Sequence, residues 1–104
     1  MTKYLLNYHG GSAPQSKEEG ERVMKAWTDW MGVLGKALVD AGNPAGQSRT
    51  IAANGKVTTG GGANPSTGYS ILEAKSLEDA VSLSSGCPIF KSGGSIEVAE
   101  LMQM

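Results

Sequence analysis

A chain of 104 residues with 39% hydrophobic and 18% charged residues has the size and composition of one soluble globular domain, and not of a disordered protein. A formal net charge of -1 gives no long-range attraction for phosphate backbones, so a nucleic-acid partner is not expected. The chain holds no apolar run of about 18 residues, so a membrane partner is not expected either.

The first expected elements are a strand and a long helix. Residues 3–9 are rich in tyrosine and leucine, which predicts a mostly buried strand. Ser16 followed by Glu19 is a capping-box pattern and predicts a helix over residues 17–40, ended by Gly42 and Pro44. Apolar residues at three- and four-residue spacing predict one buried stripe along this helix, made of Val23, Met24, Trp27, Trp30, Met31, Leu34 and Leu38. Gly32 and Gly35 share one face of it, which indicates close approach of another backbone or space for a ligand.

A hairpin, a strand, a short helix and a last strand are expected next. Asn54-Gly55 joins the β-compatible residues 48–53 and 56–59, and this dipeptide is the strongest local hairpin signal. Residues 68–74 predict a strand, and Ser76 with Asp79 predicts the start of a helix over residues 77–85. Residues 95–102 alternate between apolar and polar and predict a strand with one solvated face. The inward side of the short helix is expected to hold Leu77, Ala80, Val81 and Ser84.

This order of elements predicts an α+β fold. Short, right-handed connections fold it as a ferredoxin-like βαββαβ subunit over residues 1–104, with an extra hairpin and an antiparallel sheet that has both helices on one face. Two helices cannot cover the other face of the sheet. A second subunit is the natural cover, so we expect a homodimer.

Four stretches carry a resemblance to a known family: KYLLNYHGG, AWTDWMGVLGKALVDAGNP, TTGGGANPSTGYSILEAKSLEDA and GCPI. Together they resemble the YCII-related proteins, a family also known for a DGPF motif and placed in the dimeric α/β-barrel superfamily. The resemblance covers nearly the whole chain. It implies a ferredoxin-like subunit that pairs sheet to sheet, with a cavity bounded by the first strand, the helices and neighbouring loops. Many relatives carry Asp-Gly-Pro-Phe after the hairpin, whereas this chain has Thr-Gly-Gly-Gly at residues 59–62, so the motif aspartate is absent.

His9 is the candidate catalytic residue, as a general acid or base at the end of the first strand. The alternative is a strand-end histidine that bonds the following turn or faces solvent. Enzymatic proposals for the YCII-related proteins rest on a histidine–aspartate pair, and Asp29 in the long helix is the candidate carboxylate here. Asp29 lies off the apolar stripe, so it faces either solvent or the sheet.

The candidate ligand-binding residues are the two tryptophans and the glycine-rich loop. Trp27 and Trp30 share a helix face and are candidates for core packing or for a small-molecule pocket. The loop lacks the Gly-Lys-Ser/Thr ending of a phosphate-binding Walker loop, and a strand follows it instead of a helix, which argues against nucleotide binding. We expect the loop to lie along the edge of the cavity beside His9, with Asn64, Ser66 and Tyr69 as ligand contacts. An exposed connection is the alternative.

The single cysteine, Cys87, excludes an internal disulfide and favours a reducing, cytoplasmic location, and the N-terminal residues are soon too polar for a signal peptide. No basic partner lies near Cys87, so we expect it to be buried and structural. One histidine and one cysteine do not predict a metal centre, and no cofactor is expected. Two functions remain: a small-molecule enzyme or binding protein that uses His9, and a non-catalytic dimerisation or accessory module.

Overall fold

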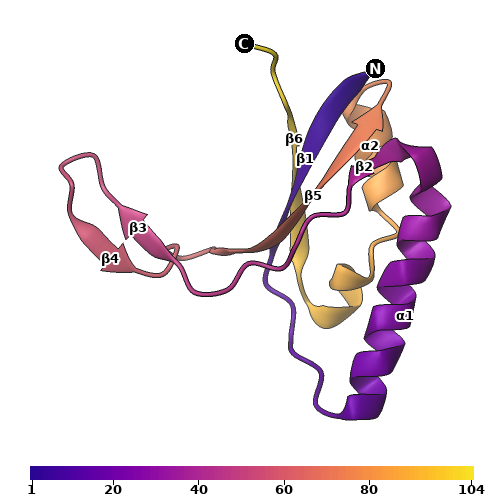
Figure 1. The fold of residues 1–104 in the computed structure, drawn as a ribbon, viewed down its shortest axis with the longest axis horizontal. Helices are drawn as coiled ribbons and strands as arrows, with labels where there is room; N and C mark the ends of the chain where they lie inside the picture. Colours follow the sequence, from indigo (N-terminus) through magenta and orange to yellow (C-terminus); the bar gives the residue numbers. More distant parts are fainter.

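The protein is described here by a computed structural model, which covers residues 1–104 throughout. It is an α+β fold with two helices and an antiparallel sheet, compatible with the ferredoxin-like arrangement expected from the sequence (Figure 1). A short 3₁₀ helix follows α1 and another follows α2, at Gly35–Ala37 and Pro88–Ser92. The main elements are β1 (Thr2–His9), α1 (Lys17–Leu34), β2 (Leu38–Asp40), β3 (Arg49–Ile51), β4 (Val57–Thr59), β5 (Ser66–Ala74), α2 (Leu77–Ser84) and β6 (Ser95–Glu100). No helix is both long enough and apolar enough to cross a membrane.

The main sheet has four strands in the order β2-β5-β1-β6, and each neighbouring pair is antiparallel. Both helices lie on the same side of it (Figure 1). Because side chains alternate along a strand, Tyr4, Leu6 and Tyr8 of β1 are buried beneath the helices, whereas Leu5 and Asn7 point the other way. We call the side that the helices do not cover the open face. By register with β1, it carries Lys3, Leu5, Asn7, Tyr69, Ile71, Glu73, Glu97 and Ala99.

The core lies between the sheet and the helices and holds ten buried hydrophobic residues. Trp30 is almost fully buried, and its indole Nε1 donates to the carbonyl oxygen of Leu83, 3.3 Å away. Trp27 packs edge-on against Tyr8, with 5.2 Å between the ring centroids. The tryptophans therefore join α1 to the sheet and to α2. The ten residues are Tyr4, Leu6, Tyr8, Trp30, Leu34, Leu72, Ala74, Ala80, Cys87 and Ile89.

A short chain of buried hydrogen bonds joins the strands to the segment after β2. The Tyr8 hydroxyl donates to Ser70 Oγ over 2.8 Å, and Ser70 Oγ donates to the carbonyl oxygen of Ala41 over 2.7 Å. Burial raises the pKa of Tyr8 to about 12, because the phenolate would lose its hydration. Each hydroxyl of this chain thus has a partner, as buried polar groups require.

Both helix starts are as the capping boxes predict. Ser16 Oγ accepts a hydrogen bond from the backbone N–H of Glu19, and Ser76 Oγ accepts one from Asp79, each over 3.1 Å. The carboxylates of Glu19 and Asp79 accept in return from the backbone N–H groups just before each cap. These side chains satisfy N–H groups that a helix leaves unpaired at its N-terminus.

The end of the first helix was predicted wrongly. The helix ends at Leu34 and not at residue 40, because Gly35 takes a left-handed φ of 55° and its N–H closes back on Met31. Leu38 then belongs to β2, where it pairs with Leu72 of β5. Gly32 and Gly35 also lack the expected close contact, since a β-carbon at either position would meet no other atom within 4 Å.

The buried stripes of both helices are narrower than predicted. In α1, Met24 is exposed, and the buried line is formed by Trp30 and Leu34 with Trp27 and Met31 partly buried. In α2, Ala80 and Ser84 are buried as expected, but Leu77 and Val81 are exposed. Helix α2 is only about two turns long, so it presents few positions to the sheet.

The predicted hairpin is confirmed. Strands β3 and β4 pair only with each other, with Arg49 opposite Thr59 and Ile51 opposite Val57. Gly55 in its turn has a φ of 86°, but Asn54 does not have a positive φ. The strands end at Ile51 and begin again at Val57, so the connection is longer than the two-residue turn that Asn54-Gly55 predicts. The hairpin projects away from the main sheet (Figure 1), and we call residues 49–59 the arm. The radius of gyration is 15.0 Å, against about 13 Å for a compact domain of this size.

Candidate functional site

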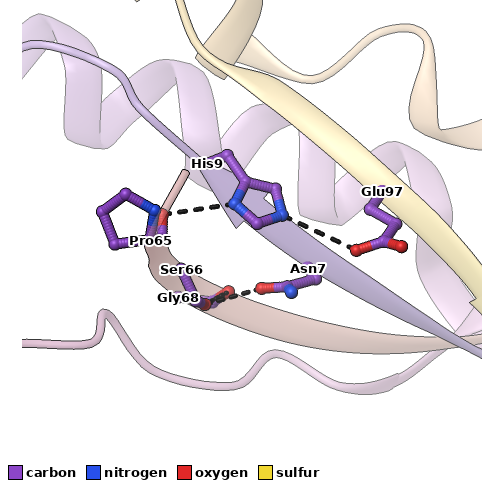
Figure 2. A network of polar contacts seen from close by, with 6 residues as sticks. All are labelled: Asn7, His9, Pro65, Ser66, Gly68 and Glu97. Atoms are coloured by element: carbon purple, nitrogen blue, oxygen red, sulfur yellow. Dashed lines mark hydrogen bonds and ion pairs between the residues drawn. The ribbon is translucent and has the colours of Figure 1, made fainter. Parts of the chain in front are cut away.

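His9 ends β1 and is 9% exposed. Its Nδ1 lies 3.2 Å from the carbonyl oxygen of Pro65, and its Nε2 lies 3.7 Å from Oε1 of Glu97 (Figure 2). A carbonyl oxygen can only accept, so Nδ1 carries the proton of the neutral imidazole. Nε2 then holds the lone pair and points toward the Glu97 carboxylate. The ring is fixed in one tautomer by a backbone group, which is how a histidine is prepared for proton transfer.

A second polar pair lies beside the histidine. Ser66 Oγ donates to Oδ1 of Asn7 over 2.6 Å and also lies 3.3 Å from the carbonyl oxygen of Gly68 (Figure 2). Asn7 is two residues before His9 in the strand, so both belong to the same row of side chains along β1. The Asn7 amide nitrogen donates to no group of the chain, which leaves it free to bind a ligand.

A local irregularity in the sheet brings these groups together. Tyr8 pairs with Gly68, but the next residue, His9, pairs with Ser66, so Thr67 is an extra residue on β5. Bulges of this kind redirect side chains and are common beside functional sites. Gly68 allows a close approach of the backbone there, because a β-carbon would lie 3.0 Å from the carbonyl oxygen of Asn43. The bulge brings the end of the glycine-rich loop, at Pro65 and Ser66, against His9 and Asn7.

Two of the predicted contact residues lie in the same neighbourhood as His9. Ser66 bonds Asn7, as described above, and Tyr69 is opposite Asn7 on β5 with its side chain on the open face, partly exposed. Asn64 is an exposed residue of the loop and makes no side-chain hydrogen bond within the chain. The glycine-rich loop therefore does reach His9, through its last residues.

Three predicted site residues lie on the other side of the sheet. Trp27 and Trp30 pack on the helix-covered face, with 5.8 Å between their ring centroids, and belong to the core region rather than to the surroundings of His9. Asp29 is exposed on α1, where its Oδ2 pairs with Lys25 Nζ at 2.8 Å. The structure does not bring Asp29 to His9, because the sheet separates them.

Glu97 is the carboxylate beside His9, and it was not among the predicted site residues. It lies on β6, opposite Asn7, with 69% of its side chain exposed. The alternation of Ile96 and Val98 with Glu97 does predict that Glu97 is on the solvated side of its strand. In a ferredoxin-like sheet β6 lies beside β1. This adjacency, taken together with the alternation, predicts that the carboxylate lies near His9.

The glycine-rich loop also lines a groove of about 560 Å³. The groove lies between residues 45–49 and 59–67, and Pro65 and Ser66 belong both to it and to the surroundings of His9. Arg49 is the one charged residue that lines it. The groove is open to solvent, and neither His9 nor the tryptophans line it.

Cys87 is buried, as predicted, and burial raises the pKa of its thiol to about 11. A thiol with a raised pKa is a poor nucleophile near neutral pH. No three His, Cys, Asp or Glu side chains lie close enough together to hold a metal ion. In comparisons with known proteins, no family model matches the chain, and no curated protein matches it.

Proposed function

We propose that this protein is a small-molecule enzyme or binding protein of the YCII-related kind, with His9 as its acid/base group. The observation that carries the proposal is the fixed imidazole: Nδ1 is held by the Pro65 carbonyl oxygen while Nε2 faces Glu97. The backbone acceptor at Nδ1 favours the neutral tautomer in which Nε2 is free to accept a proton.

The geometry supports proton transfer at Nε2. The neutral imidazole would accept a proton from a substrate O–H or C–H group at this nitrogen, and the imidazolium would then form an ion pair with Glu97. Glu97 is largely exposed, so it can pass the proton to water. Asn7, Ser66 and Tyr69 line the approach and supply the hydrogen-bonding groups that would orient a polar ligand.

Glu97 also bears on the missing motif aspartate. The resemblance to the YCII-related family implies a carboxylate beside the histidine, but this chain has Thr-Gly-Gly-Gly where many relatives have Asp-Gly-Pro-Phe. In our proposal Glu97 serves as that carboxylate, reached from β6 instead of from the loop. A carboxylate would then still lie beside the histidine, although it comes from β6 and not from the loop.

A homodimer that pairs the open faces into a dimeric α/β barrel is part of the proposal. The supporting observation is a row of apolar side chains across three strands of the open face, where Leu5 lies between Ile71 and Ala99. A second copy would remove this row from water and enclose His9. A reducing, cytoplasmic location completes the proposal, since Cys87 has no partner for a disulfide.

A thermal-shift screen against a metabolite library tests the function. His9→Asn is the informative variant, because its amide can still donate to the Pro65 carbonyl oxygen but has no counterpart of Nε2. We expect ligands that raise the melting temperature of the wild type, and we expect turnover of at least one of them to be lost in His9→Asn and Glu97→Gln. Asp29→Asn is the matched control, because Asp29 lies on the far side of the sheet. If no ligand raises the melting temperature, or if His9→Asn retains full turnover, the proposal is wrong.

The second function, a non-catalytic dimerisation or accessory module, is favoured by the exposed arm. The arm exposes Ile51 and Val57, the helices leave the open face uncovered, and the groove is open rather than enclosed. This function predicts that His9→Asn leaves protein partners and cellular phenotype unchanged. Turnover of any substrate by the wild type, lost in His9→Asn, would exclude it.

A further inference from the structure

We propose that the groove between residues 45–49 and 59–67 is a binding site for a small oxyanion, a carboxylate or a phosphate group, with Arg49 as its charged contact. The inference goes beyond the proposed function, because His9 does not line this groove. It is also compatible with the proposed homodimer. No residue of the groove belongs to the apolar row of the open face around Leu5, and a ligand in the groove leaves the Nε2 side of His9 open.

The groove is formed where the two ends of the arm meet. The segment that enters β3 and the segment that leaves β4 lie side by side there (Figure 1), and the Gly60 N–H donates to the carbonyl oxygen of Ser48 over 3.0 Å. The volume of about 560 Å³ is typical of small-molecule sites, which span about 300–1,000 Å³. Small and polar residues line the groove, with no large apolar side chain among them, so it suits a polar ligand.

Arg49 makes the groove cationic. Between Asp40 and Glu73 the chain contains two cations, Arg49 and Lys56, and no acidic residue. Arg49 forms no ion pair within the chain. Its Nη1 donates to the carbonyl oxygen of Ser48 over 2.8 Å, which ties the guanidinium to a residue of the groove and leaves its other N–H donors free. A guanidinium with free donors is the side chain best suited to bind a carboxylate or a phosphate.

The glycine-rich loop offers backbone donors to the same groove. The φ angles are 84° at Gly60 and 85° at Gly62, whereas Gly61 between them does not have a positive φ. Successive residues of opposite hand turn their N–H groups toward one concave side, and such backbones bind anions. The N–H groups of Gly61 and Gly62 donate to no carbonyl oxygen of the chain. Gly61 also packs closely on Pro65, since a β-carbon would lie 3.0 Å from the Pro65 Cβ, and this contact holds the loop in place.

The number of charges sets the class of ligand. One guanidinium with neutral donors around it matches one oxyanion, whereas the loop lacks the Gly-Lys-Ser/Thr ending that a nucleotide's phosphates require. The side chains of Gln47, Ser48 and Thr59 also line the groove and supply neutral hydrogen-bonding groups for the rest of a ligand. The ligand is therefore a metabolite-sized molecule that carries a carboxylate or a phosphate group.

NMR titrations of the isotope-labelled full chain test the inference. The probes are sodium phosphate and sodium succinate, each compared with sodium chloride at equal ionic strength. We expect at least one probe to cause saturable shifts in the amide signals of Gly61 and Gly62 and in the Arg49 Nε–H signal. Saturation by phosphate alone assigns a phosphate group, saturation by succinate alone assigns a carboxylate, and saturation by both shows recognition of the oxyanion itself. Shifts that do not saturate, or that sodium chloride reproduces, overturn the inference.

Substitutions of the two arginines provide the matched comparison. Arg49→Gln should raise the dissociation constant of the responding probe about tenfold or more, because a charge-assisted hydrogen bond is lost. Arg49→Lys keeps the charge and should weaken binding less. Arg22→Gln is the control, since it removes the same charge from an exposed position on α1 and should leave the dissociation constant unchanged. Circular dichroism shows whether each variant is folded. A folded Arg49→Gln protein that binds the probe as tightly as the wild type overturns the inference.

One further variant separates this site from the proposed function. His9→Asn should bind the probe as tightly as the wild type, because His9 does not line the groove. Loss of probe binding in a folded His9→Asn protein would overturn the inference of a separate site. Saturable anion binding in a protein that turns over no metabolite supports the groove site and counts against the acid/base role of His9. Turnover that is lost in His9→Asn, in a protein that binds neither probe, supports the acid/base role and overturns the groove site.

Discussion

Gly42 is a position where one added methyl group should strongly destabilise the fold. It follows β2 with a φ of 72°, and its N–H donates to Oδ1 of Asp40 over 2.8 Å. A β-carbon at this position would overlap the carbonyl oxygen of Tyr69 in β5. The oxygen belongs to the backbone of a strand inside the main sheet, so no side-chain rotation can relieve the overlap.

The size of the effect follows from two terms. A left-handed backbone costs a residue with a β-carbon about 1–2 kcal/mol. Forcing an extra carbon into a filled space costs about 1–3 kcal/mol more. We therefore expect Gly42→Ala to lower the free energy of unfolding by roughly 2–5 kcal/mol, out of about 5–15 kcal/mol for a typical domain. Gly32→Ala is the opposite case, because no atom lies within 4 Å of the added carbon and the helix gains about 0.8–1.0 kcal/mol.

Urea unfolding followed by far-ultraviolet circular dichroism measures both variants. The protein concentration is held fixed, because association would add its own stabilisation. The midpoint should fall for Gly42→Ala and rise for Gly32→Ala, with the slope unchanged. If Gly42→Ala unfolds at the wild-type midpoint, residues 41–44 do not lie against Tyr69 as described, and the path of the chain after β2 is wrong.

Four further outcomes are expected. Iodoacetamide at pH 8 should modify Cys87 about 100-fold more slowly in the folded protein than in urea, because burial raises the pKa of the thiol from 9.0 to about 11. Equal rates in the two conditions would show that the thiol is accessible in the folded protein. The stability that this thiol contributes is complete below about pH 9 and is lost as the pH rises toward 11, so Cys87→Ala should unfold with a shallower dependence on alkaline pH than the wild type. Ser16→Ala and Ser76→Ala should each lower the free energy of unfolding by about 1 kcal/mol in urea titrations. Glycine at the same positions should lower it by only a few tenths of a kcal/mol. An unchanged free energy of unfolding in the alanine variants would mean that the cap hydrogen bonds contribute nothing. Trp30→Phe should destabilise the fold by about 1–3 kcal/mol in thermal unfolding because it leaves the Leu83 carbonyl oxygen unpaired, and an unchanged melting temperature would contradict that bond.

The parts of the fold that the sequence predicts are those decided by neighbouring residues. A capping box or an Asn-Gly turn is complete within four residues, so Ser16, Ser76 and Gly55 behave as expected. The end of α1 is different, because Leu38 continues the apolar spacing of Leu34 by one more turn. Its pairing with Leu72 of β5, more than thirty residues later, decides that it is a strand residue. Helical periodicity carries no information about that partner.

The same division between local and distant features holds for the site around His9. The position of His9 at a strand end and its proximity to the glycine-rich loop follow from strand order, and both are confirmed. The carboxylate beside it depends on which residue of β6 lies opposite Asn7, and register across a sheet is a non-local property. Asp29 was a candidate because of its place in the sequence. It is excluded as the partner of His9 because α1 lies on the other side of the sheet.

The position of β1 in the sheet has a consequence for synthesis of the chain. It leaves the ribosome before β5 and β6, the two strands between which it lies, and these are encoded by the second half of the chain. At roughly 5–20 residues per second, Tyr4, Leu6 and Tyr8 wait on the order of 5–20 s for their neighbours. During that interval both hydrogen-bonding edges of the strand are open to other nascent chains.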